Sequence, residues 1–380
     1  MKIVFISTML PSGHYSQIIC GGLAKQKDID LIVYADKNSE NLKIRGCGEI
    51  RNVWSKSPKY ISDILSQLRI DRPAVVHLQH ELNMYGSLTT AIMFPILVAL
   101  IRLSGYKVVT TVHAAVYKNQ INTDFLMMFH QNSTFVRPFM LKIIFEYLFR
   151  SISLFSHSII LHTKLSESIL VKDYGLDKSK ARVIPDAIPV KKIYWGKKEK
   201  YFFYFGYMVR RKGLGFALEG FSKFFKKYPK SPFKFILAGG KIKGQESAYD
   251  EIISPIKKLN LSTRVVVKGF INEKEQDKLY HKAYAVIIPA VLSMGSSGPL
   301  YHANSYGKCV IATREGHFIE DIKNQSTGIL TSNRHWDKAI AFAIDHPDMI
   351  EGIEKNVIEK AKTRSPMITA NRYFKIYQSL

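Results

Sequence analysis

The alternation of short apolar runs with segments of helical pattern constrains the fold of this chain more than any other feature. In the C-terminal third, strand-length runs end in glycine, proline or serine, and a helical pattern follows each one. The segments that show this are 238–240, 264–270, 285–289, 295–300 and 306–312. Repeated βα units are typical of a parallel, doubly wound α/β sheet. The loop Gly295-Ser-Ser-Gly298 opens one helix, and free N–H groups at such a helix start favour a phosphate ligand.

The N-terminal half shows the same alternation, which predicts a second sheet of the same kind. Its expected strands cover residues 2–8, 30–35, 74–79, 107–113, 158–162 and 181–185. A chain of 380 residues is too long for one ordinary core, so two domains are expected. We predict an N-terminal domain at 1–190, a C-terminal domain at 191–364 and a final helix at 365–380. Ligands of doubly wound sheets bind at the carboxyl ends of the strands, so both domains can face one ligand.

The chain is strongly basic, with a formal net charge of +24, and the charge is uneven. Residues 191–230 carry twelve Lys or Arg against two Glu, a local charge of +10. Such a balance predicts an anionic partner, which can be a phosphorylated ligand, an anionic lipid surface or a nucleic acid; solubility alone is the plainer explanation. The three cysteines, Cys20, Cys47 and Cys309, are scattered and form no disulfide or zinc pattern. This favours a reducing, cytoplasmic location.

Two apolar regions raise the question of a membrane. The run at 91–101 is shorter than the roughly 20 residues that a spanning helix needs and contains Pro95, which predicts a buried helix instead. The N-terminal run at 3–7 is too short for a signal peptide and predicts a strand. The aromatic stretch 125–149 and the apolar helix at 138–155 suggest a protein that rests peripherally on an anionic membrane. The alternative is that these side chains form core.

A basic turn follows the strand predicted at 201–205. In Gly206-Tyr-Met-Val-Arg-Arg-Lys-Gly213, the side chains of Arg211 and Lys212 fall between a strand end and a helix start. Arginine binds phosphate oxygens through its donor fork and lysine as a point charge, so this turn predicts a diphosphate site. Taken alone, the turn can equally be a solvated basic loop.

The histidines of the Val-His-Leu-Gln-His-Glu run are candidates for a metal or ligand site. Because His77 and His80 are three apart on a strand, their rings are expected on opposite faces, and no metal site is predicted. His80 and Glu81, at the strand end, are candidates for contact with an acceptor hydroxyl. His77 is expected to be a hydrogen-bonded core residue.

The order of motifs in the C-terminal half resembles a known family. The motifs are the glycine-bearing basic turn, Ala-Gly-Gly, Val-x-x-x-Gly-Phe, Ile-x-Pro, the Ser/Gly loop, Gly-Lys-x-Val-Ile-Ala and Gly-x-x-x-Glu. Together they resemble the nucleotide-sugar-binding domain of GT-B glycosyltransferases of the family-four type, the glycosyl transferases group 1. The resemblance extends over most of the chain, including the final helix, which crosses back to the first domain in such enzymes. It implies two Rossmann-like domains facing across a cleft.

The resemblance also implies an activity and its partners. It implies transfer of a sugar from a nucleotide-diphosphate sugar to a glycan or lipid-linked acceptor, with retention of anomeric configuration and without metal or other cofactor. The positions that match the family's donor-binding residues are Gly13, Arg211, Lys212, Ser296, Ser297, Gly298, His302 and Glu320. His113 matches the histidine that faces the transferred sugar, and is the predicted catalytic residue.

The chain departs from the family pattern at the Ser/Gly loop. Two glutamates eight residues apart are usual there, and Met294 and His302 stand in their places. The loop resembles a Ser-Ser-Gly variant that lacks the paired glutamates. His302 can contact ribose only as a neutral acceptor, and Tyr207 stands where the basic turn often has arginine. Two alternatives follow: an inactive glycosyltransferase-like partner protein, or a basic nucleic-acid-associated protein. No nucleic-acid module is recognisable, so no nucleic-acid partner is expected.

Overall fold

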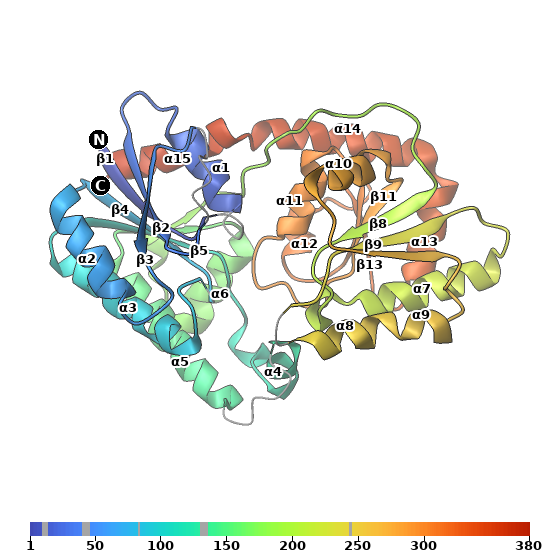
Figure 1. Cartoon of the computed structure of the whole chain (residues 1–380), viewed down its shortest axis with the longest axis horizontal. Helices are drawn as coiled ribbons and strands as arrows, with labels where there is room; N and C mark the ends of the chain where they lie inside the picture. The colour runs from blue at the N-terminus through green and yellow to red at the C-terminus, as the bar shows by residue number, and fades with distance from the viewer. Residues whose placement is uncertain (10–13, 40–45, 83, 130–135, 243–244) are drawn as a thin grey trace.

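The computed structural model describes residues 1–9, 14–39, 46–82, 84–129, 136–242 and 245–380. Gly13, a predicted donor-binding residue, lies outside these ranges. Within them, the chain forms two parallel sheets, each covered by helices on both faces (Figure 1). The predicted fold class, two Rossmann-like doubly wound domains of GT-B type, is confirmed.

The first sheet has the order β3-β2-β1-β4-β5-β6-β7, and every neighbouring pair is parallel. Its strands are β1 (Lys2–Ile6), β2 (Asp30–Asp36), β3 (Glu49–Trp54), β4 (Val75–His80), β5 (Lys107–Val112), β6 (Ser158–Leu161) and β7 (Ala181–Val183). Its helices are α1 (His14–Leu23), α2 (Tyr60–Asp71), α3 (Leu88–Leu103), α4 (Thr123–Phe129), α5 (Pro138–Phe155) and α6 (Lys164–Tyr174). The sequence analysis did not anticipate β3 or α2.

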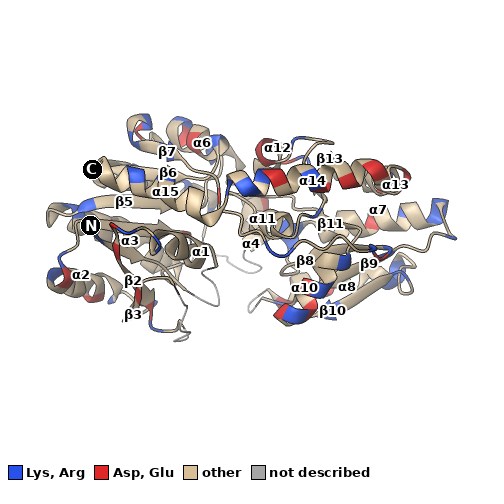
Figure 2. Ribbon diagram, turned by 90° about the horizontal axis from the view of Figure 1, so that it is seen from above, with Lys and Arg blue, Asp and Glu red and all other residues tan. Residues whose placement is uncertain are grey.

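The second sheet has the order β10-β9-β8-β11-β12-β13 and is also parallel throughout. Its strands are β8 (Tyr201–Phe205), β9 (Lys234–Ala238), β10 (Val265–Gly269), β11 (Ala285–Ile288), β12 (Val310–Thr313) and β13 (Ile329–Thr331). Its helices are α7 (Leu214–Lys227), α8 (Glu246–Ile253), α9 (Pro255–Lys258), α10 (Glu273–Lys282), α11 (Gly298–Ser305), α12 (His317–Asp321), α13 (Trp336–Asp345) and α14 (Pro347–Thr363). Charged residues gather on the outer helices of this domain, such as α10, α13 and α14 (Figure 2).

Each sheet buries apolar side chains on both faces, and the period of two along a strand divides them. In β1, Val4 and Ile6 enter the core under α2, α3 and α5, whereas Ile3 and Phe5 enter the core under α1. A strand that is apolar on both sides is the expected pattern for a parallel sheet covered by helices. The same alternation sends His77 toward Phe5 and His80 toward Phe94 on the other face, as predicted.

The chain crosses between the domains twice, and the two crossings lie side by side. The backbone N–H of Ile188 donates to the carbonyl oxygen of Arg364 at 2.7 Å. After the second crossing, helix α15 (Pro366–Gln378) packs on α1 of the first domain (Figure 1). Gly22 allows this approach, because a Cβ there would meet the Pro366 carbonyl oxygen at 2.7 Å. The exact domain boundaries proposed from the sequence remain a prediction.

Candidate active site between the two domains

The predicted site residues gather at the switch points of the two sheets. In each sheet the strand order reverses between neighbours that are not consecutive, β1 and β4 in the first and β8 and β11 in the second. Ligands of such folds bind outside the carboxyl ends of these strands. Glu81 follows β4, the basic turn with Arg211 and Lys212 follows β8, and the Ser296–Gly298 loop follows β11. The topology therefore brings these three groups to one region between the domains.

The basic turn is held rigidly against the strand that precedes the Ser/Gly loop. Residues Arg210–Lys212 form a 3-10 turn that ends at Gly213, whose φ is +63°. A Cβ at Gly213 would lie 2.0 Å from the carbonyl oxygen of Pro289, so only glycine fits there. The N–H of Val291 also donates to the carbonyl oxygen of Arg211 at 3.1 Å. These contacts fix the turn beside the loop that follows β11.

Lys212 and Arg211 are cations held in a poorly solvated place. Burial, together with the neighbouring Arg211 charge, lowers the pKa of Lys212 to about 7, although the Glu81 carboxylate partly offsets this. Burial also lowers the pKa of Arg211. The side chain of Glu81 keeps some contact with solvent, but the protein around it partly desolvates the carboxylate and raises its pKa. The charges of Arg211 and Lys212 act to lower that pKa. The excess of cations over carboxylates here suits a ligand with negative charge.

The Ser/Gly loop presents backbone donors at the start of α11. Ser297 is the N-cap, and its hydroxyl accepts from the N–H of Leu300. Among the described residues, none accepts a hydrogen bond from the N–H of Ser296, Ser297 or Gly298. The Ser296 hydroxyl is engaged elsewhere: burial raises the pKa of Asp186, and a hydrogen bond from Ser296 to that carboxyl partly offsets this. The loop therefore offers its amides, rather than its hydroxyls, to an anion.

His302 lies one turn further along α11, among aromatic rings. It stacks on Phe205 with ring centroids 5.8 Å apart, and burial lowers its pKa to about 4, so the ring is neutral. Its Nε2 is hydrogen-bonded to the side-chain amide nitrogen of Gln276. Because Nε2 accepts this bond, Nδ1 carries the proton. A contact of His302 with a ribose hydroxyl stays a prediction.

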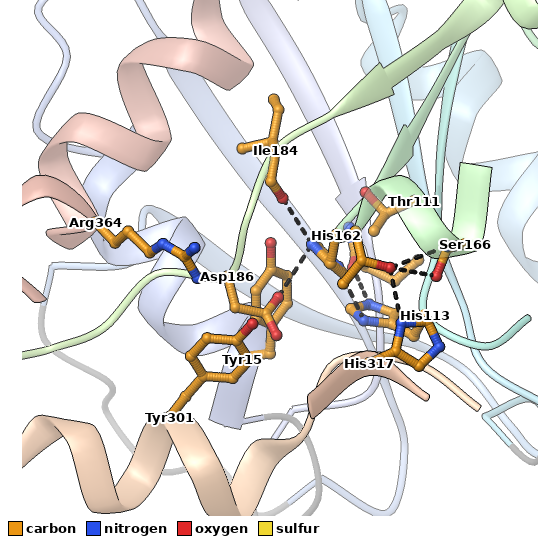
Figure 3. Close-up of polar contacts among 12 residues, drawn as sticks. Tyr15, Thr111, His113, His162, Ser166, Ile184, Asp186, Tyr301, His317 and Arg364 are labelled. Carbon is orange, nitrogen blue, oxygen red and sulfur yellow. Dashed lines mark hydrogen bonds and ion pairs between the residues drawn. The ribbon is translucent and has the colours of Figure 1, made fainter. Parts of the chain in front are cut away.

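His113, the predicted catalytic residue, has partners at both ring nitrogens. Its Nε2 lies 2.7 Å from Gln79 Oε1. Its Nδ1 lies 3.2 Å from His162 Nε2 (Figure 3). Burial and the neighbouring histidines lower its pKa well below the usual range. His113 is thus a neutral ring fixed in orientation, with no free nitrogen for proton transfer in this arrangement.

His162 and Asp186 extend this row of hydrogen-bonded side chains, and the sequence did not predict them. His162 Nδ1 lies 2.9 Å from the Ile184 carbonyl oxygen and 3.0 Å from Asp186 Oδ1, and a carbonyl oxygen can only accept (Figure 3). Nδ1 therefore carries a proton. Burial raises the pKa of the Asp186 carboxyl, although the charge of the neighbouring His162 acts to lower it.

His80 and Glu320 have contacts within the protein, and their predicted roles in acceptor and donor binding stay predictions. His80 is only 1% exposed, and its ring packs on Phe94 with centroids 4.7 Å apart. The two carboxylate oxygens of Glu320 accept from the N–H groups of Lys164 and Leu165 at 2.8 and 2.9 Å. Glu320 therefore caps helix α6 of the other domain, where the helix dipole favours negative charge.

The domains also meet at a backbone contact beside His113. The N–H of Ala115 is hydrogen-bonded to the carbonyl oxygen of Met294, and Met294 packs with Leu292 against the core of the first domain. A Cβ on Gly295 would lie 1.8 Å from the carbonyl oxygen of His113. Met294, which replaces a family glutamate, is thus part of a contact that brings the Ser/Gly loop next to His113.

Known proteins resemble this chain in the family of its C-terminal domain and in its fold. Residues 190–364 match the model of the family described as glycosyl transferases group 1. The C-terminal domain belongs to this family. No protein of curated function matches the chain in sequence. Among the described residues, no three His, Cys, Asp or Glu side chains are placed to hold a metal ion.

Solved structures of low sequence identity share the fold over the whole chain. Anabaena HepE, in complex with UDP, has a TM-score of 0.77 and 14% identity, and the match covers 100% of both chains. Sucrose-phosphate synthase from Thermosynechococcus elongatus has a TM-score of 0.76 and 13% identity, covering 100% of this chain and 98% of that one. A glycosyltransferase from Rickettsia africae has a TM-score of 0.70 and 14% identity, with the same coverage. At these identities the likeness establishes the GT-B fold.

The contact at Gly295 can be tested by hydrogen exchange. We expect Gly295→Ala to push the loop away from the His113 carbonyl, since backbone cannot yield as a side chain does. An overpacking cost of about 1–3 kcal/mol would speed exchange of the Ala115 amide roughly five- to hundred-fold. Gly298→Ala is the matched control, because a Cβ there meets nothing within 4 Å. Unchanged exchange at Ala115 in Gly295→Ala would contradict the close domain contact.

Proposed function

We propose that this protein is a glycosyltransferase that transfers a sugar from a nucleotide-diphosphate sugar, bound between its two domains, to a glycan or lipid-linked acceptor. The observation that carries the proposal is the cluster of Lys212, Arg211 and the free amides of the Ser296–Gly298 loop. All three kinds of donor are directed by the fold to the switch point of the second sheet. The structural neighbour HepE has been solved with UDP and with UDP-glucose, which favours the same class of donor here.

The proposed chemistry is electrostatic. When the bond between sugar and diphosphate breaks, negative charge grows on the leaving diphosphate, and Lys212, Arg211 and the loop amides stabilise it. Removing one such preorganised donor typically costs about 10²–10³ in rate. The basic residues take the part that a metal ion plays in other phosphate sites, so we propose a metal-independent reaction.

Proton transfer is proposed to involve the substrate itself. Both ring nitrogens of His113 are hydrogen-bonded to protein, so we assign His113 to positioning the transferred sugar. The leaving phosphate would then take the acceptor proton on the same face as the attack, which retains the anomeric configuration. Glu81 faces the basic turn from the first domain and is proposed to hydrogen-bond an acceptor hydroxyl.

Donor binding is the first prediction to test. We expect one of UDP-, GDP- and ADP-glucose to raise the melting temperature by several degrees, because a ligand at a hundred times its Kd stabilises the folded state by about 2.7 kcal/mol. Lys212→Ala should abolish the shift. Lys226→Ala, an exposed lysine on α7, is the matched control and should keep it.

Two results would count against the proposal in different ways. If no nucleotide sugar shifts the melting temperature of the wild-type protein, the donor site is absent and the inactive-partner or nucleic-acid alternatives gain. If a nucleotide sugar binds equally well to Lys212→Ala, the binding site lies elsewhere than at the basic turn.

The pH dependence of donor binding follows from the lowered pKa of Lys212. The charged ammonium binds the diphosphate, so affinity should be highest below pH 7 and fall by up to about tenfold per pH unit above it. At pH 8 the free lysine is mostly neutral, and binding should take up close to one proton. Calorimetry of a nucleotide sugar in buffers of different ionisation enthalpy measures this uptake.

A second variant serves as the control for the pH prediction. The Glu81 carboxylate raises the pKa of Lys212, so Glu81→Gln should lower it and move the loss of affinity to lower pH. Proton uptake that is the same in Lys212→Ala as in the wild type would assign the titration to another group.

A further inference from the structure

Two neighbouring helices of the first domain expose apolar side chains along their outer faces. Helices α3 and α5 pack on each other, and the inner faces of both enter the same core. On α5, Phe139, Ile143, Tyr147 and Leu154 are exposed, by between 44% and 67%. Their spacing of four, four and seven residues places them on one side of the helix, away from the sheet.

Helix α3 repeats this pattern beside α5. Ile96, Leu100 and Leu103 are exposed at spacings of four and three residues, and Leu103 is 76% exposed. Both helices lead from the carboxyl edge of the sheet back to its opposite edge, so they run in the same direction. Because both cover the same face of the sheet, their outer sides point the same way (Figure 1). We call this surface, made of the exposed residues of α3 and α5, the α3–α5 face.

Basic residues outnumber acidic ones on and beside the α3–α5 face. The two helices contain a single acidic residue, Glu146, whose carboxylate is neutralised by Lys118 at 2.5 Å and Arg150 at 2.8 Å. The basic residues on or beside the face are Arg102, Lys107, Lys142, Arg150 and Lys180. Lys180 lies against the end of α5, where its ammonium donates to the carbonyl oxygens of Ser153 and Leu154. Asp177 is an acidic residue at the same end of α5, so the border is mainly, though not wholly, basic. Exposed apolar residues with such a border are complementary to an anionic, partly apolar surface.

We propose that the α3–α5 face docks this protein onto an anionic membrane surface. The apolar side chains would enter the boundary between headgroups and acyl chains, and the lysines and arginines would meet the headgroup phosphates. In the described part of the chain, no helix is long and apolar enough to cross a bilayer, so the contact lies along the surface. A second copy of the chain is a poorer occupant, because it would bring like basic charges together.

The docking geometry would also serve the proposed reaction. Helix α5 begins at the carboxyl edge of the sheet, which is the edge that carries Glu81. Helix α4, which precedes it, reaches the second domain: the Met127 carbonyl oxygen accepts from Arg210 Nη1 at 3.2 Å, and the Arg211 guanidinium lies over the Phe129 ring at 5.7 Å. The inference that docking presents a lipid-linked acceptor to this site rests on the proposed function, whereas membrane binding itself does not.

The test is flotation of the full-length protein with phosphatidylcholine vesicles that contain or lack phosphatidylglycerol. We expect binding only to the anionic vesicles. Ile96→Ser with Ile143→Ser and Leu154→Ser should reduce the bound fraction at least about tenfold. Arg102→Gln with Lys142→Gln should weaken binding by about fivefold per charge and make the remaining binding less sensitive to salt. Phe216→Ser with Val266→Ser, which removes exposed apolar side chains from the second domain, is the matched control and should bind as the wild type does.

Folding and function are monitored separately from docking. Each variant should keep its melting temperature and its nucleotide-sugar shift, so that loss of docking is not confused with unfolding or with failure of the donor site. The proposal is overturned by equal binding to neutral and anionic vesicles, by no binding to either at low salt, or by vesicle binding that survives the triple serine variant. Concentration-dependent dimerisation that the triple serine variant abolishes would assign the face to a second copy instead.

Discussion

The contact of two backbones, at Gly295 and His113, is the constraint on which the rest of the site depends. It leaves no room for a side chain on Gly295, and the hydrogen bond from Ala115 to Met294 and the cap that Glu320 provides for α6 act beside it. These contacts join the loops that follow the central strands of the two sheets. The basic turn and the Ser/Gly loop of the second domain therefore lie opposite Glu81 and His113 of the first. Neither domain carries a complete set of these groups alone.

A polar chain through the interior of the first domain supports the same region. It runs from Asp186 through His162 and His113 to Gln79 and His77, and His77 in turn contacts Tyr377 on the returning helix α15. Each buried nitrogen along it has a partner, which is the condition under which a polar core is tolerated. This row of hydrogen-bonded side chains connects Asp186, beside the first inter-domain crossing, to the His113 ring. A change in the crossing segment can therefore alter the orientation of His113.

Local sequence patterns were sufficient for the fold and for part of the site. The βα alternation predicted both sheets, the family resemblance implied the returning helix, and the period of two separated His77 from His80. The patterns did not predict features that tertiary contacts determine. In β3 (Glu49–Trp54), polar and apolar residues alternate too weakly for the strand to be recognised. The burial of His80 depends on Phe94 from a neighbouring helix. His162 and Asp186 carry no motif, and their pairing depends on two strand ends that meet only in the folded sheet. Glu320 follows the family motif, yet its carboxylate binds a helix start that no local pattern could indicate.

The central claim is that one diphosphate is held by the basic turn and the Ser/Gly loop together. A crystal structure of the protein with its nucleotide diphosphate tests this most directly. The account predicts diphosphate oxygens within about 3 Å of Lys212 Nζ, of the Arg211 guanidinium and of at least one amide among Ser296, Ser297 and Gly298. A diphosphate bound at another place, or one that contacts neither the turn nor the loop, would contradict it.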